Sequence, residues 1–117
     1  MKNVLVVYGD GEVERKKIAG SELSFLQRLV GGNIEIVLGR DYSYVVNEEG
    51  VLIGMPVNPI ASTLMIADGW MGQFVLGTVV ITSKAKNGLL PGLTDVQLEK
   101  LTNMCAISKR TWGLLTI

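Results

Sequence analysis

Apolar residues recur along the chain at strand-like spacing in some segments and at helical spacing in others. Asn3–Tyr8 is an aliphatic run rich in β-branched residues, which is typical of a buried strand. Glu12–Ile18 is polar and is expected to lead back from the Gly-Asp-Gly turn that precedes it. Asn33–Leu38 and Val75–Thr82 are predicted as further strands from their β-branched and aliphatic content.

The stretch with the most distinctive turn residues is Tyr44–Pro59, and it predicts a hairpin. Asn47–Gly50 has asparagine first and glycine fourth, the preferences of a type I turn. We expect one short apolar strand before this turn, entered through Tyr42–Val46, and a second one after it. A bend through Gly54 and Pro56 should then end the hairpin.

Two segments in the first two-thirds of the chain have helical spacing and recognisable start signals. Ser21 is expected to cap a helix over Glu22–Val30, which has one apolar face and ends at a Gly-Gly pair. Asn58 is expected to cap a second helix through Ile60–Ala67, because the proline that follows the asparagine suits the first helical position.

A third helix is predicted near the C-terminus. Thr94 and Gln97 have the spacing of a capping box before Asp95–Ala106. Residues 108–117 form an apolar tail, which is expected to dock on the sheet or on a neighbouring subunit. The order β-β-α-β-β-β-α-β-α predicts a single α+β domain over residues 1–117, with a mostly antiparallel sheet and two or three helices packed on one face.

Composition limits the classes of function. Eleven basic and eleven acidic residues give zero net charge, whereas proteins that bind duplex nucleic acid carry a basic excess. No apolar run is long enough to cross a bilayer, so no membrane partner is expected. A single cysteine, Cys105, excludes an internal disulfide and favours a reducing compartment, so a cytoplasmic location is expected.

The chain contains no histidine, which removes the commonest general base and most catalytic zinc sites. The one adjacent acidic pair, Glu48-Glu49, falls in the predicted turn, where two carboxylates would be solvated rather than convergent. Cys105 lies on an apolar helix face and is expected to be inert. We therefore expect no enzyme activity, no catalytic residue, no cofactor and no metal site.

A glycine-rich motif and a basic motif each have a structural and a functional interpretation. Gly9–Gly11 follows a strand but lacks the third glycine and the helix of a nucleotide-binding loop, so a hairpin turn is favoured. Arg15–Lys17 is expected to be the solvated edge of a strand, where charge discourages aggregation, with a phosphate contact as the alternative.

Candidate ligand-binding residues are the arginine, aromatic and small polar side chains placed on loops and at a helix start. Such residues suit stacking on a base or partner, and a helix N-terminus can hold an anion. The alternative is that the two tryptophans fill the core or a subunit contact. The candidates are Arg40, Tyr42, Tyr44, Asn58, Ser62, Thr63, Trp70 and Trp112.

Four stretches taken together carry a family resemblance: FLQRLVGGNIEIV, VVNEEGVLIGMPVNPIAS, FVLGTVVIT and LTDVQLEKL. With them the chain resembles the domain-of-unknown-function family 3846, which is common in phages, prophages and plasmid-like elements. The resemblance covers about two-thirds of the chain. It implies a mobile-element origin and brings no enzymatic activity with it.

Three hypotheses of function follow. The first is a phage anti-defence protein, a homo-oligomer that binds and sequesters a small anionic ligand such as a cyclic nucleotide signal. The second is a protein-interaction module that inhibits or recruits a host or phage protein. The third is an enzyme, which would need a metal held by Asp and Glu side chains.

Overall fold

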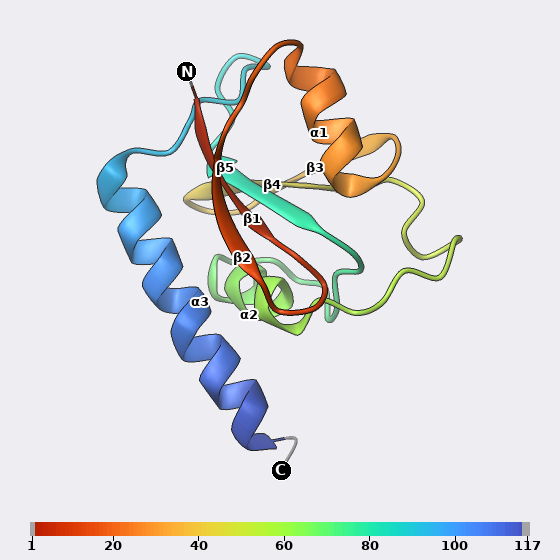
Figure 1. Cartoon of the computed structure of the whole chain (residues 1–117), viewed down its shortest axis with the longest axis vertical. Helices are drawn as coiled ribbons and strands as arrows, with labels where there is room; N and C mark the ends of the chain where they lie inside the picture. The colour runs from red at the N-terminus through yellow and green to blue at the C-terminus, as the bar shows by residue number, and fades with distance from the viewer. Residues whose placement is uncertain (1, 116–117) are drawn as a thin grey trace.

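The computed structural model describes residues 2–115. Within these residues the chain forms one five-stranded antiparallel sheet, of order β2-β1-β5-β4-β3, and three helices (Figure 1). The predicted α+β fold class is therefore confirmed. In chain order the elements are β1 (Asn3–Val7), β2 (Val13–Lys17), α1 (Glu22–Val30), β3 (Ile34–Leu38), β4 (Tyr42–Asn47), α2 (Pro59–Ala67), β5 (Val79–Ser83) and α3 (Asp95–Leu115).

The local start and stop signals place the first two helices as predicted. Ser21 accepts a hydrogen bond from the Ser24 amide at the start of α1, and Gly31 ends that helix at φ 80°. Asn58 caps α2 through its Oδ1, which accepts from the amide of Ala61. β1 and β2 pair as an antiparallel hairpin, which confirms that Gly9–Gly11 is a turn.

The predicted hairpin over Tyr44–Pro59 is wrong. Its first strand exists as β4, but β4 pairs with β3 and β5 rather than with the residues that follow it. Val51, Leu52 and Ile53 form exposed turns instead of a strand, and Val57 makes only an isolated bridge with Leu76. β4 thus pairs with the strand that precedes it, β3, and with the distant strand β5.

Two further element boundaries differ from the sequence prediction. The strand expected over Val75–Thr82 is shortened to β5, because Gly77 adopts a left-handed φ of 77° before the strand begins. The third helix is confirmed at its capping box, where Thr94 and Gln97 exchange two hydrogen bonds. That helix does not end at Ala106 but continues to Leu115.

Two helices, α2 and α3, pack on one face of the sheet as predicted, and α1 covers the other face. Val4, Val6 and Val80 point toward α1, while Leu5, Val7 and Ile81 point toward α2 and α3. Strand residues alternate between faces, and because both faces of the central strands are apolar, each needs its own helical cover. In Figure 1, α1 lies apart from the pair formed by α2 and α3.

The apolar C-terminal segment is part of α3 and not a separate tail. Through residue 115 it continues the helix beside α2, and its C-terminal end reaches beyond the sheet (Figure 1). Trp112 makes its hydrogen bond with α2 rather than with a strand. Thr116 and Ile117, the end of the predicted tail, lie outside the described residues.

Candidate functional site

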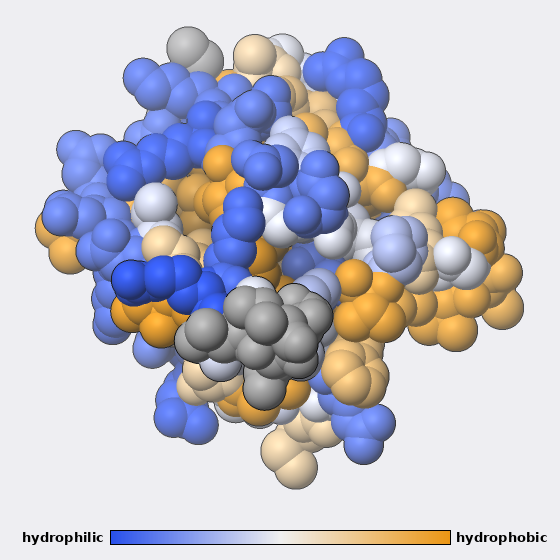
Figure 2. All heavy atoms as spheres, turned by 60° about the horizontal axis from the view of Figure 1, so that its bottom comes forward, coloured by the Kyte–Doolittle hydropathy of each residue, from blue (hydrophilic) through white to orange (hydrophobic). Residues whose placement is uncertain are grey.

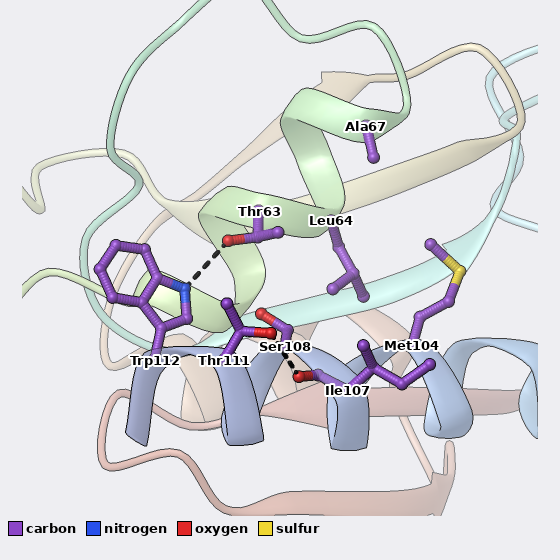
Figure 3. A pocket seen from close by; sticks show the side chains of 8 residues that line it. All are labelled: Thr63, Leu64, Ala67, Met104, Ile107, Ser108, Thr111 and Trp112. Atoms are coloured by element: carbon purple, nitrogen blue, oxygen red, sulfur yellow. Dashed lines mark hydrogen bonds between the residues drawn. The ribbon is translucent and has the colours of Figure 1, made fainter. Parts of the chain in front are cut away.

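A pocket of about 330 Å³ lies between α2 and α3. Figure 3 shows side chains from both helices converging on it, with the indole of Trp112 at one end and Met104 at the other. Among the described residues that line it, none is charged. The lining residues are Thr63, Leu64, Ala67, Met104, Ile107, Ser108, Thr111 and Trp112.

Helical periodicity explains why these side chains meet. The α3 residues that line the pocket stand at positions i, i+3, i+4, i+7 and i+8, which places them on one face of a helix: Met104, Ile107, Ser108, Thr111 and Trp112. That face is turned toward the side of α2 that carries its own lining residues.

The indole of Trp112 is held in place by a hydrogen bond. Its Nε1 donates to Thr63 Oγ1 at 3.1 Å, and that hydroxyl donates in turn to the carbonyl of Pro59 at 2.9 Å. The ring is half-buried and forms one wall of the pocket (Figure 3). Two of the residues predicted as ligand contacts, Thr63 and Trp112, are thus brought together.

Ser108 contributes a buried hydroxyl that has no hydrogen-bond partner within the described chain. Its side chain lines the pocket and is only 5% exposed. Buried hydroxyls are nearly always paired, and an unpaired one costs about 1–3 kcal/mol. The Ser108 hydroxyl is therefore the one buried side-chain group of the described residues without a hydrogen bond.

A smaller cavity of about 150 Å³ continues the pocket toward the sheet, sharing Leu64, Ala67 and Met104 with it. Tyr42 and Tyr44 line this cavity together with Asp68. Two of the predicted aromatic contacts therefore lie at the inner end of the same groove as Trp112.

Asp68 is the polar centre of that inner end. Its carboxylate accepts hydrogen bonds from the amides of Asp41 and Tyr42 at 2.9 and 3.1 Å and from the Tyr44 hydroxyl at 2.9 Å. Burial, and then the bond to Asp68, raise the pKa of Tyr44 above its ordinary value. Arg40 is exposed, and its guanidinium lies over Gly69 at the end of α2.

Two predicted contacts, Asn58 and Ser62, are buried and fully engaged in holding the fold together. Asn58 Nδ2 donates to the carbonyls of Val7 and Gly77, both at 2.9 Å, in addition to its capping bond. Ser62 Oγ donates to the Asn58 carbonyl and accepts from the amide of Val75. Neither side chain faces the α2–α3 groove.

Trp70 lies apart from the other candidates, in a depression beside β3 that also includes Phe74 and Val51. Its ring packs on Gly72, where any Cβ would collide with the indole. The structure therefore separates the two tryptophans that the sequence had grouped.

The sequence prediction missed Met104, Ile107, Ser108 and Asp68. Met104 lies within the helix that the sequence predicted, and Ile107 and Ser108 could have been found by continuing its periodicity beyond Ala106. Asp68 could not, because the groups it binds lie 24 to 27 residues earlier in the chain.

The remaining motifs keep structural roles. Glu48 and Glu49 are exposed in the turn after β4. Cys105 is buried against α2 and the sheet, and burial raises the pKa of its thiol to about 11. Among residues 2–115, no cluster of three acidic or cysteine side chains could hold a metal ion. No described helix combines the length and apolar character required to span a membrane.

The fold and groove define a small α+β domain with helices on both faces of an antiparallel sheet and an apolar pocket between two of them. The chain belongs to the family described as Domain of unknown function (DUF3846), whose pattern matches residues 1–106. No curated protein and no solved structure matches it. Ile107, Ser108, Thr111 and Trp112 follow the matched region, so half of the pocket lining lies beyond it.

Proposed function

We propose that this chain is a non-enzymatic binding protein that captures a small ring-bearing molecule, such as the base of a nucleotide signal, between α2 and α3. The observation that carries the proposal is that one apolar pocket is lined by both the Trp112 indole and the Ser108 hydroxyl, which has no hydrogen-bond partner. Ligand sites are typically concave and apolar, with a few polar groups that fix orientation.

The dimensions and chemistry of the pocket favour a flat, uncharged ligand group. Its volume of about 330 Å³ falls at the lower end of the range for small-molecule sites, roughly 300–1,000 Å³. Stacking on an aromatic side chain contributes about 1–3 kcal/mol per base. Since the lining residues are uncharged, an anionic ligand would place its ring inside and its phosphates at the solvent-exposed mouth.

The biological role that we propose is sequestration of a host signal on behalf of a mobile element. Sequestration requires only tight binding, and a chain without histidine can perform it with aromatic and hydroxyl groups alone. Heat denaturation of protein purified from a host, followed by mass spectrometry of the released small molecules, would identify a carried ligand.

The binding proposal is tested by comparing the two tryptophans. Titration calorimetry against a panel of nucleosides, nucleotides and cyclic dinucleotides should find at least one ligand. Trp112→Ala should weaken its binding at least about tenfold, because an aromatic anchor is lost. Trp70→Ala is the matched control and should change the affinity less than about twofold, because Trp70 lies outside the groove.

Circular dichroism must show that both variants are folded before their affinities are compared. Equal losses in the two variants would place the site elsewhere. The absence of binding across the whole panel would remove the nucleotide proposal.

One observation favours a second candidate function, a module that binds a host or phage protein. Val51, Leu52 and Ile53 are 80%, 85% and 56% exposed in consecutive positions after β4. Figure 2 shows apolar surface gathered on the side where this loop projects. Exposed apolar patches mark protein-interaction sites. A one-to-one protein complex in which amide exchange slows over residues 50–54 would favour this alternative.

A further inference from the structure

β3 is an edge strand whose outward backbone groups can be identified from its bonds to neighbouring residues. At one end the Glu48 amide donates to the backbone carbonyl of Asn33, and at the other end the Gly39 amide donates to the backbone carbonyl of Tyr42. In an antiparallel ladder every second residue bonds to the neighbouring strand. Given the register, Glu35 and Val37 bond to β4, as Asn33 and Gly39 do.

The N–H and C=O groups of Ile34, Ile36 and Leu38 therefore point away from the sheet. Within residues 2–115 no other segment pairs with them. Ile36 and Leu38 are also 42% and 59% exposed. An open edge with exposed apolar side chains is a template for pairing with another strand.

The two edges of the sheet differ sharply in charge. β2, at the opposite edge, carries Arg15, Lys16 and Lys17, and such charges oppose strand addition. The only charged residue of β3 is Glu35. The chain has zero net charge, so no long-range repulsion keeps two copies apart.

We propose that β3 pairs with β3 of a second copy of this chain, antiparallel and about a two-fold axis at Ile36. In this register Ile36 faces its own counterpart, and Ile34 of each copy faces Leu38 of the other. These are the three residues whose backbone groups are free, and each such pair forms two hydrogen bonds. The result is a continuous sheet through both subunits.

The strand is self-complementary in this register, which favours a second copy over an unrelated peptide. The side chains of Ile34, Ile36 and Leu38 form one apolar stripe across the axis, on the face of the sheet that carries α1. On the other face Glu35 lies opposite Val37, so the two carboxylates do not oppose each other directly. Phe74 and Val51, both exposed, lie in the depression beside Glu35 and Val37 and extend the apolar contact.

Sedimentation velocity on the full chain tests the proposal. At roughly 100 μM, where even a micromolar complex is populated, the chain should sediment as a dimer of twice 12.7 kDa. Ile36→Lys should weaken the dimer at least about tenfold, because it places two like charges on the axis. Val96→Lys, on an exposed site of α3, is the matched control and should remain dimeric.

Amide exchange of the unmodified chain provides a second test that does not depend on a variant. The amides of Ile34, Ile36 and Leu38 should exchange more slowly as the protein concentration rises. Those of Glu35 and Val37 should be protected at every concentration, since they bond to β4. A monomer at roughly 100 μM, a dimer that Ile36→Lys leaves intact, or concentration-independent exchange at Ile36 would each overturn the proposal.

Discussion

Ser108 has the most informative single side chain of the candidate site. Its hydroxyl is buried without a partner, whereas the nearby Thr111 hydroxyl donates to the carbonyl of Ile107 at 3.0 Å. Both residues line the same pocket on the same helix. Only Ser108 therefore carries a hydrogen-bonding cost that an incoming ligand could relieve.

Ser108→Ala should separate stability from binding. Removing an unpaired buried hydroxyl should leave the free energy of unfolding unchanged or raise it by up to about 1 kcal/mol, because alanine also favours the helix. Affinity for the ligand should fall roughly three- to tenfold with the loss of one hydrogen bond. Urea unfolding and titration calorimetry measure the two effects.

The matched control for that substitution is Thr102→Ala, on the same helix but outside the pocket. The Thr102 hydroxyl donates to the carbonyl of Leu98 at 2.6 Å. Its loss should leave ligand affinity unchanged. If Ser108→Ala instead destabilised the fold by more than about 1 kcal/mol, its hydroxyl would have a structural role.

The residue that caps helix α2, Asn58, also attaches the helix to the sheet. Asn58 caps the helix and also binds two carbonyls, one at the end of β1 and one just before β5. Its side chain is completely buried. The cap is therefore also a crosslink between α2 and two strands of the sheet.

Asn58→Ala should lower the free energy of unfolding by about 2–4 kcal/mol, the sum of a lost cap and of two lost hydrogen bonds to backbone carbonyls. Ser21→Ala is the matched control, because Ser21 caps α1 from an exposed position and crosslinks nothing. It should cost only about 0.5–1 kcal/mol. Equal losses in urea unfolding would show that the carbonyl bonds add nothing.

How well the sequence predicts each element depends on how local its determinants are. α1 and α2 are predicted within a residue of their ends, because Ser21, Asn58 and Gly31 act on their immediate neighbours. The prediction of a strand after Asn47 is wrong because an apolar run such as Val51–Ile53 needs a partner strand to pair with. Both sides of β4 are already occupied, by β3 and by β5.

The candidate site was predicted only in part for the same reason. Thr63 and Trp112 are 49 residues apart in the chain and meet only because α2 packs on α3. The sequence identified both as candidate ligand contacts from their residue types, but it could not predict that they lie side by side. Because residues 108–117 were predicted to be an apolar tail rather than helix, Ser108 was not placed on the helix face that carries Met104.

At the scale of the whole molecule, one core joins the sheet to α2 and α3. Cys105 and Tyr44 are both buried in it, and burial raises the pKa of each. The Cys105 thiol shifts from its ordinary 9.0 to about 11. Both groups are neutral in the fold at neutral pH, and both would have to ionise inside an apolar environment at high pH.

Global stability should therefore fall as the pH rises from 9 to 11. In that range the unfolded chain releases the Cys105 proton while the folded chain retains it, so the stability present below pH 9 is progressively lost, by about 2–3 kcal/mol. Tyr44 adds a loss of the same sign above its ordinary pKa of 10.0. Urea unfolding across this range should give a shallower decline for Cys105→Ala than for the unmodified chain. Parallel pH profiles for the two proteins would show that the thiol does not contribute.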